Sequence, residues 1–218
     1  LQGQDILKTD LASKTPMIQA RRQTRIPSVW TKEELDSLIG AIDRGNPKGK
    51  RDYAMILLAC VLGLRVTDIK NLTFDCFHWE AKKLKFTQSK TRQIVTRPIP
   101  AEVGWAIIDY LTYGRPKVNS SIIFVRHLAP FLPFSESDHL HQIIRDYMRI
   151  AHLPILKKRR GMHSLRHTAA SRMLEHDTPL VIISDIYGHM DTDSTAVYLK
   201  TDIKKLRECC LGTPEVGS

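Results

Sequence analysis

The chain has 218 residues, of which 42% are hydrophobic and 26% charged, the balance of a globular domain with a buried core. No apolar run approaches the roughly 20 residues of a membrane-spanning helix, and no signal-peptide pattern opens the chain, so we expect no membrane partner. The formal net charge of +10 favours a polyanionic partner, most often a nucleic acid.

The first 28 residues are polar and basic without a sustained periodicity, which predicts an arm or linker over 1–28. The chain begins with Leu rather than Met, so we expect it to be part of a longer protein whose missing portion lies N-terminal. Its cysteines form no C-x-x-C pair and predict free thiols in a reducing compartment. They are Cys60, Cys76, Cys209 and Cys210.

A domain is predicted over 29–211. It opens with a helix from Thr31 to about Ile42, where Thr31 and Glu34 form a capping box and Trp30 can pack on Leu35. A loop is expected over 44–49. Residues 53–62 are almost wholly apolar and predict a central, buried helix.

Gly63 follows this helix at the position where a left-handed residue is wanted, and a second helix is predicted over 64–72. Arg65 lies at this junction, where an arginine is costly unless it has a carboxylate or an anionic ligand. Asp68, three residues on, can pair with it or brace it. A structural Arg65–Asp68 ion pair is the simpler interpretation of this segment alone.

Three short strands are predicted next, over 77–80, 84–87 and 94–99, forming an antiparallel sheet. Lys90 and Arg92 lie at the tip of the second turn, where a rigid support can present functional side chains. A solvated basic turn is the alternative. Further helices are predicted over 101–113 and 138–151, with a buried extended segment between them. His139 and His141 are treated as surface residues.

A polar helix start follows, in which His163 and Arg166 lie one turn apart. The helix is predicted to end near His176, with Leu165, Ala169 and Met173 facing the core. Its N-terminus follows four cations, and a helix start of this kind is suited to holding an anion. These cations are candidate DNA-binding residues together with Arg92, and they are Lys157, Lys158, Arg159 and Arg160.

The last predicted helices run from Pro179 to Tyr187, around Tyr198, and over 202–211, with a disordered tail over 212–218. Gly188 ends the first of them and His189 follows it. Taken singly, His189 can cap a helix and Tyr198 can be a packing aromatic. The fold class is therefore mainly α with a small three-stranded antiparallel β-sheet.

Residues 30–200 resemble the catalytic domain of the tyrosine recombinases, the phage-type integrases. The similarity lies in Gly63-Leu64-Arg65-Val66-Thr67-Asp68, in the hairpin lysine Lys90, in His163-Ser164-Leu165-Arg166-His167 and in Gly188-His189 followed by Tyr198. Tyr187 stands where the family usually has Leu. The resemblance implies six catalytic residues, with Asp68 in support, and they are Arg65, Lys90, His163, Arg166, His189 and Tyr198.

The residue types suit metal-independent cleavage of a DNA phosphodiester. Two guanidiniums, Arg65 and Arg166, can each donate two hydrogen bonds to a phosphate. By the resemblance, Tyr198 is the nucleophile that forms a 3′-phosphotyrosyl link. A phenol with a pKa near 10 needs a base, for which His163 is the candidate, and Lys90 would protonate the 5′-oxygen. His189 would hydrogen-bond the phosphate.

The function expected is site-specific DNA recombination, with double-stranded DNA as partner and a tetramer of full-length protomers as the working unit. No cofactor and no metal site is expected, since no carboxylate cluster is apparent and His167 near His163 has no evident third ligand. The resemblance implies a bacterial, cytoplasmic, nucleoid-associated protein without the family's N-terminal core-binding domain. Two alternatives are DNA relaxation of the type IB topoisomerase kind and a DNA-binding module without catalysis.

Overall fold

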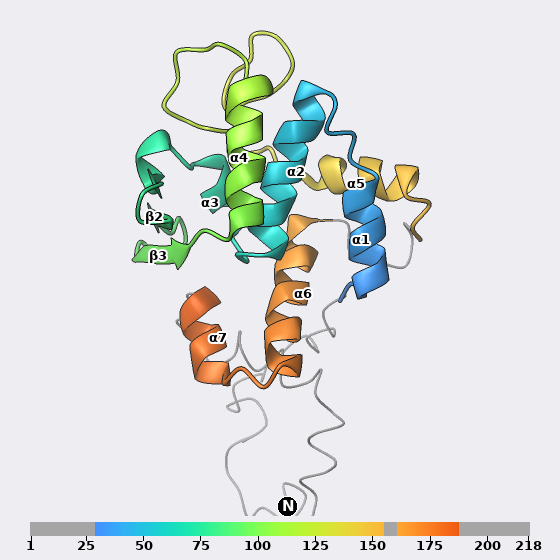
Figure 1. Cartoon of the computed structure of the whole chain (residues 1–218), viewed down its shortest axis with the longest axis vertical. Helices are drawn as coiled ribbons and strands as arrows, with labels where there is room; N and C mark the ends of the chain where they lie inside the picture. Colours follow the sequence, from blue (N-terminus) through green and yellow to red (C-terminus); the bar gives the residue numbers. More distant parts are fainter. Residues whose placement is uncertain (1–28, 155–160, 188–218) are drawn as a thin grey trace, which may run out of the picture.

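The computed structural model describes residues 29–154 and 161–187, and they fold as a helical domain with one small sheet (Figure 1). The arm predicted over 1–28, the cations at 157–160 and everything from Gly188 onward lie outside the described residues. That last part includes His189, Tyr198, the two helices predicted there and the tail. In the described part, no helix combines the length and apolar character that crossing a membrane requires.

Helix α1 (Lys32–Gly40) begins at the predicted capping box: the Glu34 N–H donates to the Thr31 hydroxyl and the Thr31 N–H donates to the Glu34 carboxylate. Helix α2 (Pro47–Cys60) starts six residues earlier than predicted. The loop predicted over 44–49 is wrong from Pro47 onward. Asn46 caps the helix by accepting from the Gly49 N–H at 2.7 Å, and Pro47 occupies its first turn.

Helix α2 lies at the centre of the fold, as its apolar sequence predicts. Residues 53–59 are all buried, and α2 packs against α4 (Ala101–Tyr113) on one side and α6 (Met162–Glu175) on another (Figure 1). After Gly63, the short helix α3 (Val66–Lys70) carries the predicted inward side chains of its region, Leu64, Ile69 and Leu72, into the core. Burial of these apolar groups is the main force that holds α3 beside α2.

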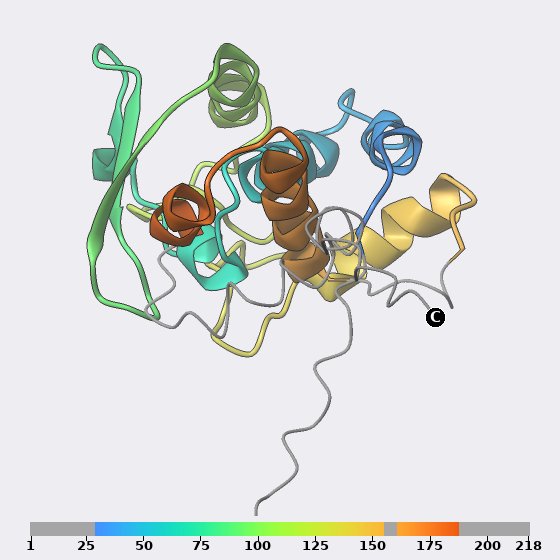
Figure 2. The ribbon, with the colours of Figure 1, turned by 90° about the horizontal axis from the view of Figure 1, so that it is seen from below.

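The predicted antiparallel sheet is confirmed, with strands β1 (Phe77–His78), β2 (Lys83–Thr87) and β3 (Ile94–Pro98) in the order β1-β2-β3. A single 3₁₀ turn (Phe74–Cys76) precedes it. Along β2 the side chains alternate, because Leu84 and Phe86 are buried whereas their neighbours face solvent. The sheet lies along one side of the helical core (Figure 2).

Helix α4 has the predicted bounds, whereas α5 (His141–Ile150) begins three residues later than predicted. His139 therefore precedes the helix, and both His139 and His141 are exposed, as expected. Helix α6 ends one residue before His176 and leads into α7 (Leu180–Tyr187), which packs beside it (Figures 1 and 2). This brings the end of α7 back to the α2–α3 junction.

Candidate active site

Arg65 lies at the N-cap position of α3, where the chain turns after the buried helix α2. Its side chain is half-buried, and its Nη2 donates a 2.9 Å hydrogen bond to the backbone carbonyl of Tyr187, the last residue of α7. The ion pair that the sequence left open, Arg65 with Asp68, is not among the ion pairs of the described residues. The guanidinium is directed toward α7.

Arg166 reaches the same point from α6. Only 3% of it is exposed, and its Nη2 donates to the Tyr187 carbonyl at 2.6 Å while Nη1 donates to the Gly63 carbonyl. The guanidinium carbon lies 4.3 Å from the centroid of the Tyr187 ring. Arg65 and Arg166, a hundred residues apart in the chain, therefore bond one carbonyl oxygen and form a pair of neighbouring cations.

A third arginine, which the sequence analysis missed, joins this group from the sheet. Arg97 Nη2 donates to the carbonyl of Ile186, one residue before Tyr187. Arg97 is paired with Leu84 in the antiparallel register, and paired residues point to the same face of a sheet. Since Leu84 is fully buried, a correct register would have placed Arg97 toward the helices from the sequence alone.

Asp68 has a different role from pairing with Arg65. It is buried, and its Oδ1 accepts a 2.8 Å hydrogen bond from the backbone N–H of Ser89 in the β2–β3 turn. Lys90, the predicted proton donor, is the next residue and is exposed. Asp68 thus connects the turn that carries Lys90 to the helix that follows Arg65, and its predicted supporting role stays a prediction.

The β2–β3 turn is itself ordered by short-range bonds. The Arg92 N–H donates to the Gln88 carbonyl at 2.9 Å, and Arg92 adopts a left-handed backbone with φ of 58°. Its side chain is exposed beside that of Lys90, so this turn presents two cations to solvent. That is the placement expected of a DNA-facing hairpin tip, and the roles of both residues stay predictions.

His163 is exposed in the first turn of α6, and its ring meets the edge of the His167 ring at 4.2 Å between centroids. Arg166, one turn along, is buried, whereas His163, the predicted base, is exposed. Within 29–154 and 161–187, no three His, Cys, Asp or Glu side chains gather as a metal site would require. Burial raises the pKa of the Cys60 thiol to about 12, which disfavours its thiolate form.

Trp30 fixes the start of α6 in a way that the sequence did not reveal. Its indole Nε1 donates to the Ser164 hydroxyl and its backbone N–H donates to the Thr168 hydroxyl, both at 2.9 Å. The residue is almost fully buried. Because both partners lie within one turn of Arg166, the segment before α1 holds the helix that carries His163 and Arg166.

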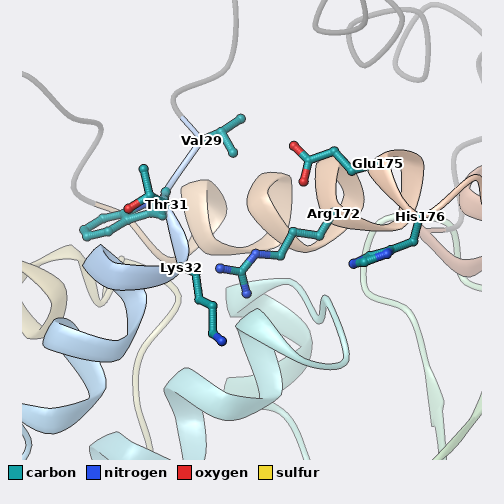
Figure 3. Close-up of a pocket in the computed structure, with 7 residues that line it drawn as sticks. Val29, Thr31, Lys32, Arg172, Glu175 and His176 are labelled. Atoms are coloured by element: carbon teal, nitrogen blue, oxygen red, sulfur yellow. The ribbon is translucent and has the colours of Figure 1, made fainter.

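A pocket of about 620 Å³ lies beside the C-terminal half of α6 (Figure 3), and neither arginine of this pair lines it. Arg172 extends from α6 along the side where Lys32 of α1 lies (Figure 3). The other lining residues are Val29, Trp30, Thr31, Glu175 and His176. None of the predicted catalytic residues lines it. The candidate active site is therefore the junction of α3, α6 and α7 and not this pocket.

Comparison with solved structures defines the class of protein. The crystal structure of XerA recombinase superposes with a TM-score of 0.69 at 25% identity, covering 84% of this chain and 64% of that chain. XerH recombinase bound to palindromic difH substrate superposes with a TM-score of 0.70 at 18% identity over 86% of this chain and 54% of that one, a likeness of fold alone. The fold is that of a tyrosine recombinase catalytic domain.

Sequence comparison gives the family. Residues 28–205 match the phage integrase family. A putative integrase/recombinase of Sinorhizobium fredii, y4gC, is 32% identical over 87% of this chain and 97% of its own length. Another from that organism, y4rA, is 34% identical over 95% of this chain, which spans about half (50%) of y4rA. The chain belongs to the phage integrase family, as its motifs indicated.

Proposed function

We propose that this chain cleaves and rejoins DNA in site-specific recombination through a covalent 3′-phosphotyrosyl intermediate. The observation that carries the proposal is the shared acceptor: Arg65 and Arg166 both donate to the carbonyl oxygen of Tyr187. Two guanidiniums in one place, with a third from Arg97 beside them, form a site for the non-bridging oxygens of a phosphodiester.

The arginines supply the electrostatic part of catalysis. Negative charge builds on the phosphate oxygens as the nucleophile attacks, and donors fixed before the reaction stabilise that charge without reorganising. One such donor is typically worth about 3–4 kcal/mol of barrier. Arg166 is 3% exposed, and a cation shielded from water interacts more strongly with a phosphate than one at the surface.

The proposed step is an in-line displacement at phosphorus. The Tyr198 phenol oxygen forms a bond to phosphorus as the bond from phosphorus to the 5′-oxygen breaks. The phenol proton passes to His163, and Lys90 gives a proton to the departing 5′-oxygen, while His189 hydrogen-bonds the phosphate. The reverse displacement by a 5′-hydroxyl rejoins the strand, and because the phosphotyrosyl link keeps the phosphoryl group, rejoining needs no ATP.

The partner we propose is double-stranded DNA, gripped mainly through its phosphates, with a tetramer of full-length protomers as the working unit. The net charge of +10 supports this. So do solved protein–DNA complexes of similar fold, among them Tn1549 transposon integrase with transposon right end DNA and lambda integrase bound to a COC' core site. We place the protein in the bacterial cytoplasm, acting on nucleoid DNA.

Covalent capture tests the proposal. The chain is incubated with a pool of nicked duplexes with randomised arms, so that the short strand beyond the cleavage point diffuses away and the adduct accumulates. We expect a DNA–protein adduct whose linkage maps by mass spectrometry to Tyr198 and which Tyr198→Phe abolishes while retaining DNA binding. Tyr113→Phe is the matched control, because Tyr113 is 72% exposed on α4. Equal adduct yield from Tyr198→Phe would show that another residue is the nucleophile.

A further inference from the structure

Tyr187 occupies an unusual position among the residues of the candidate site. It is the last residue of α7, it is fully buried, and the family usually has Leu at this place. Its backbone carbonyl accepts from both Arg65 and Arg166. Its ring lies against the Arg166 guanidinium, with 4.3 Å between the guanidinium carbon and the ring centroid. One residue therefore touches Arg166 from two directions.

Gly63 contacts both the Tyr187 ring and the Arg166 guanidinium. A Cβ built on Gly63 would lie 2.7 Å from atoms of the Tyr187 ring, closer than real Cβ contacts come, so the ring fills the space that the glycine leaves. Gly63 also has φ of +62°, and its carbonyl accepts from Arg166 Nη1. The guanidinium is thus oriented by two carbonyls and one aromatic face, which fix both the position and the tilt of its plane.

We propose that Tyr187 is a positioning residue for the strand-cleavage reaction, whose ring holds the Arg166 guanidinium in the orientation that receives the scissile phosphate. The inference rests on the proposed function. A guanidinium carries five N–H donors, so bonds to carbonyls set the direction of its plane and are compatible with donation to a phosphate. A leucine at this place keeps the backbone carbonyl but offers no π face to the cation.

The ring and the hydroxyl of Tyr187 are separable by substitution. Tyr187→Phe keeps the aromatic face, and we expect a cleavage rate within about threefold of the parent. Tyr187→Leu removes the face, and we expect a rate about tenfold to thirtyfold lower, the size of a desolvated cation–π contact. If Tyr187→Leu does not fold, Tyr187→Met takes its place in the experiment, because the unbranched methionine side chain has about the volume of leucine. Phe124→Leu is the control for loss of a buried ring, because Phe124 is fully buried in the α4 region of the core.

A change of substrate distinguishes positioning from packing. Rates are measured in single turnover with saturating DNA on a phosphodiester and on a methylphosphonate, which lacks one charged non-bridging oxygen. If Tyr187 acts through Arg166, the defect of Tyr187→Leu shrinks on the methylphosphonate, since less charge is left for the guanidinium to stabilise. An equal defect on both substrates, or an unchanged rate on the phosphodiester, overturns the inference.

A measurement on the protein alone keeps this result separate from the proposed function. If the parent forms no adduct with any DNA, the proposed function fails, and the orientation of Arg166 is then read by ¹⁵N NMR of its guanidinium, assigned with Arg166→Lys. We expect hindered rotation about the Nε–Cζ bond in the parent and in Tyr187→Phe, and faster rotation in Tyr187→Leu. Equal rotation in all three overturns the inference whatever the protein does to DNA.

Discussion

Two arginines in this domain are almost equally hidden from solvent and are held by different kinds of partner. Arg51, on α2, is 4% exposed, and its Nε and Nη2 donate to Asp52 Oδ1 at 2.8 and 2.6 Å. Arg166 is 3% exposed and donates to two backbone carbonyls over an aromatic ring. A carboxylate neutralises a guanidinium, whereas a carbonyl dipole orients it and carries no net charge.

The Arg51 network is therefore complete within the fold. Asp52 Oδ2 also accepts from the Tyr147 hydroxyl of α5 at 3.0 Å, and Arg51 Nη1 donates to the Val125 carbonyl at 3.2 Å. Burial raises the pKa of the Asp52 carboxyl above its ordinary value, and the Arg51 charge, which favours the ionised form, offsets this only in part. This group joins α2, α5 and the backbone at Val125, whereas the Arg166 group joins α3, α6 and α7, where we place the chemistry.

The largest effect on stability is expected at Arg51. Arg51→Met leaves the Asp52 carboxylate buried without its cation, which typically costs about 3–5 kcal/mol of unfolding free energy. Urea denaturation measures this loss, and the cleavage rate per folded molecule should match the parent. The double variant Arg51→Met with Asp52→Leu should recover most of the loss. A cleavage defect in the folded fraction of Arg51→Met would remove the distinction between the two arginines.

Arg166→Lys should show the opposite pattern. Lysine keeps the charge but cannot bond two carbonyls and a phosphate with a planar fork, so we expect cleavage slowed about 10²–10³-fold. The unfolding midpoint in urea should move far less than in Arg51→Met, because lysine keeps the positive charge at this position. Single-turnover adduct formation measures the rate. If Arg166→Lys were strongly destabilised in urea yet cleaved DNA at the parent rate per folded molecule, Arg166 would be the structural arginine of the two.

A smaller effect on the cleavage rate is expected when the β2–β3 turn is loosened. Asp68→Ala removes the acceptor of the Ser89 N–H, a bond to a charged group worth about 1.5–3 kcal/mol, and we expect the turn to present Lys90 less well and cleavage to slow about tenfold. A substrate with sulfur in place of the 5′-oxygen needs no proton on leaving, so it should restore the rate. The exposed Asp75 serves as control through Asp75→Ala. A defect that persists on the sulfur substrate would assign Asp68 another role.

The sequence predicted those parts of the fold and site that depend on local pattern. The capping box at Thr31, the left-handed Gly63, the three strands and α4 follow from a few neighbouring residues, and the structure confirms them. The start of α2 was missed because Asn and Pro mark loops as well as helix N-termini. Only the packing of the following helix decides between these two meanings of the pattern.

The site was predictable only in its motif residues. Arg65 and Arg166 were singled out by resemblance, yet that both bond the Tyr187 carbonyl depends on residues 122 and 21 positions away. The same holds for the contact of Asp68 with Ser89. From the sequence, Asp68 was expected either to pair with Arg65 or to brace it. Such contacts are set by how helices pack, and side-chain spacing along one helix does not contain that information. The predicted roles of His189 and Tyr198 lie outside the described residues.

The smallest effect on stability is expected at His127, whose pKa depends in part on the charge of Arg51. Burial first, and then the charges of Arg51 and Lys48, lower the pKa of His127 to about 4, and its Nε2 is buried without a hydrogen-bond partner among the described residues. The folded protein therefore keeps this ring neutral, whereas the unfolded chain takes up a proton near pH 6.5.

The sign of the pH dependence follows from this difference in proton uptake. The contribution of neutral His127 is complete above about pH 6.5 and is lost progressively as the pH falls toward about 4, since the unfolded state binds the extra proton. The unfolding free energy is measured in urea at about pH 7.5 and at about pH 4.5. Between these two values His127→Phe should lose about 1 kcal/mol less unfolding free energy than the parent. The expected difference is smaller than the full pKa shift would give, because His127 is only partly buried. Parallel curves for the two proteins would mean that His127 titrates normally and that the Arg51 charge does not reach it.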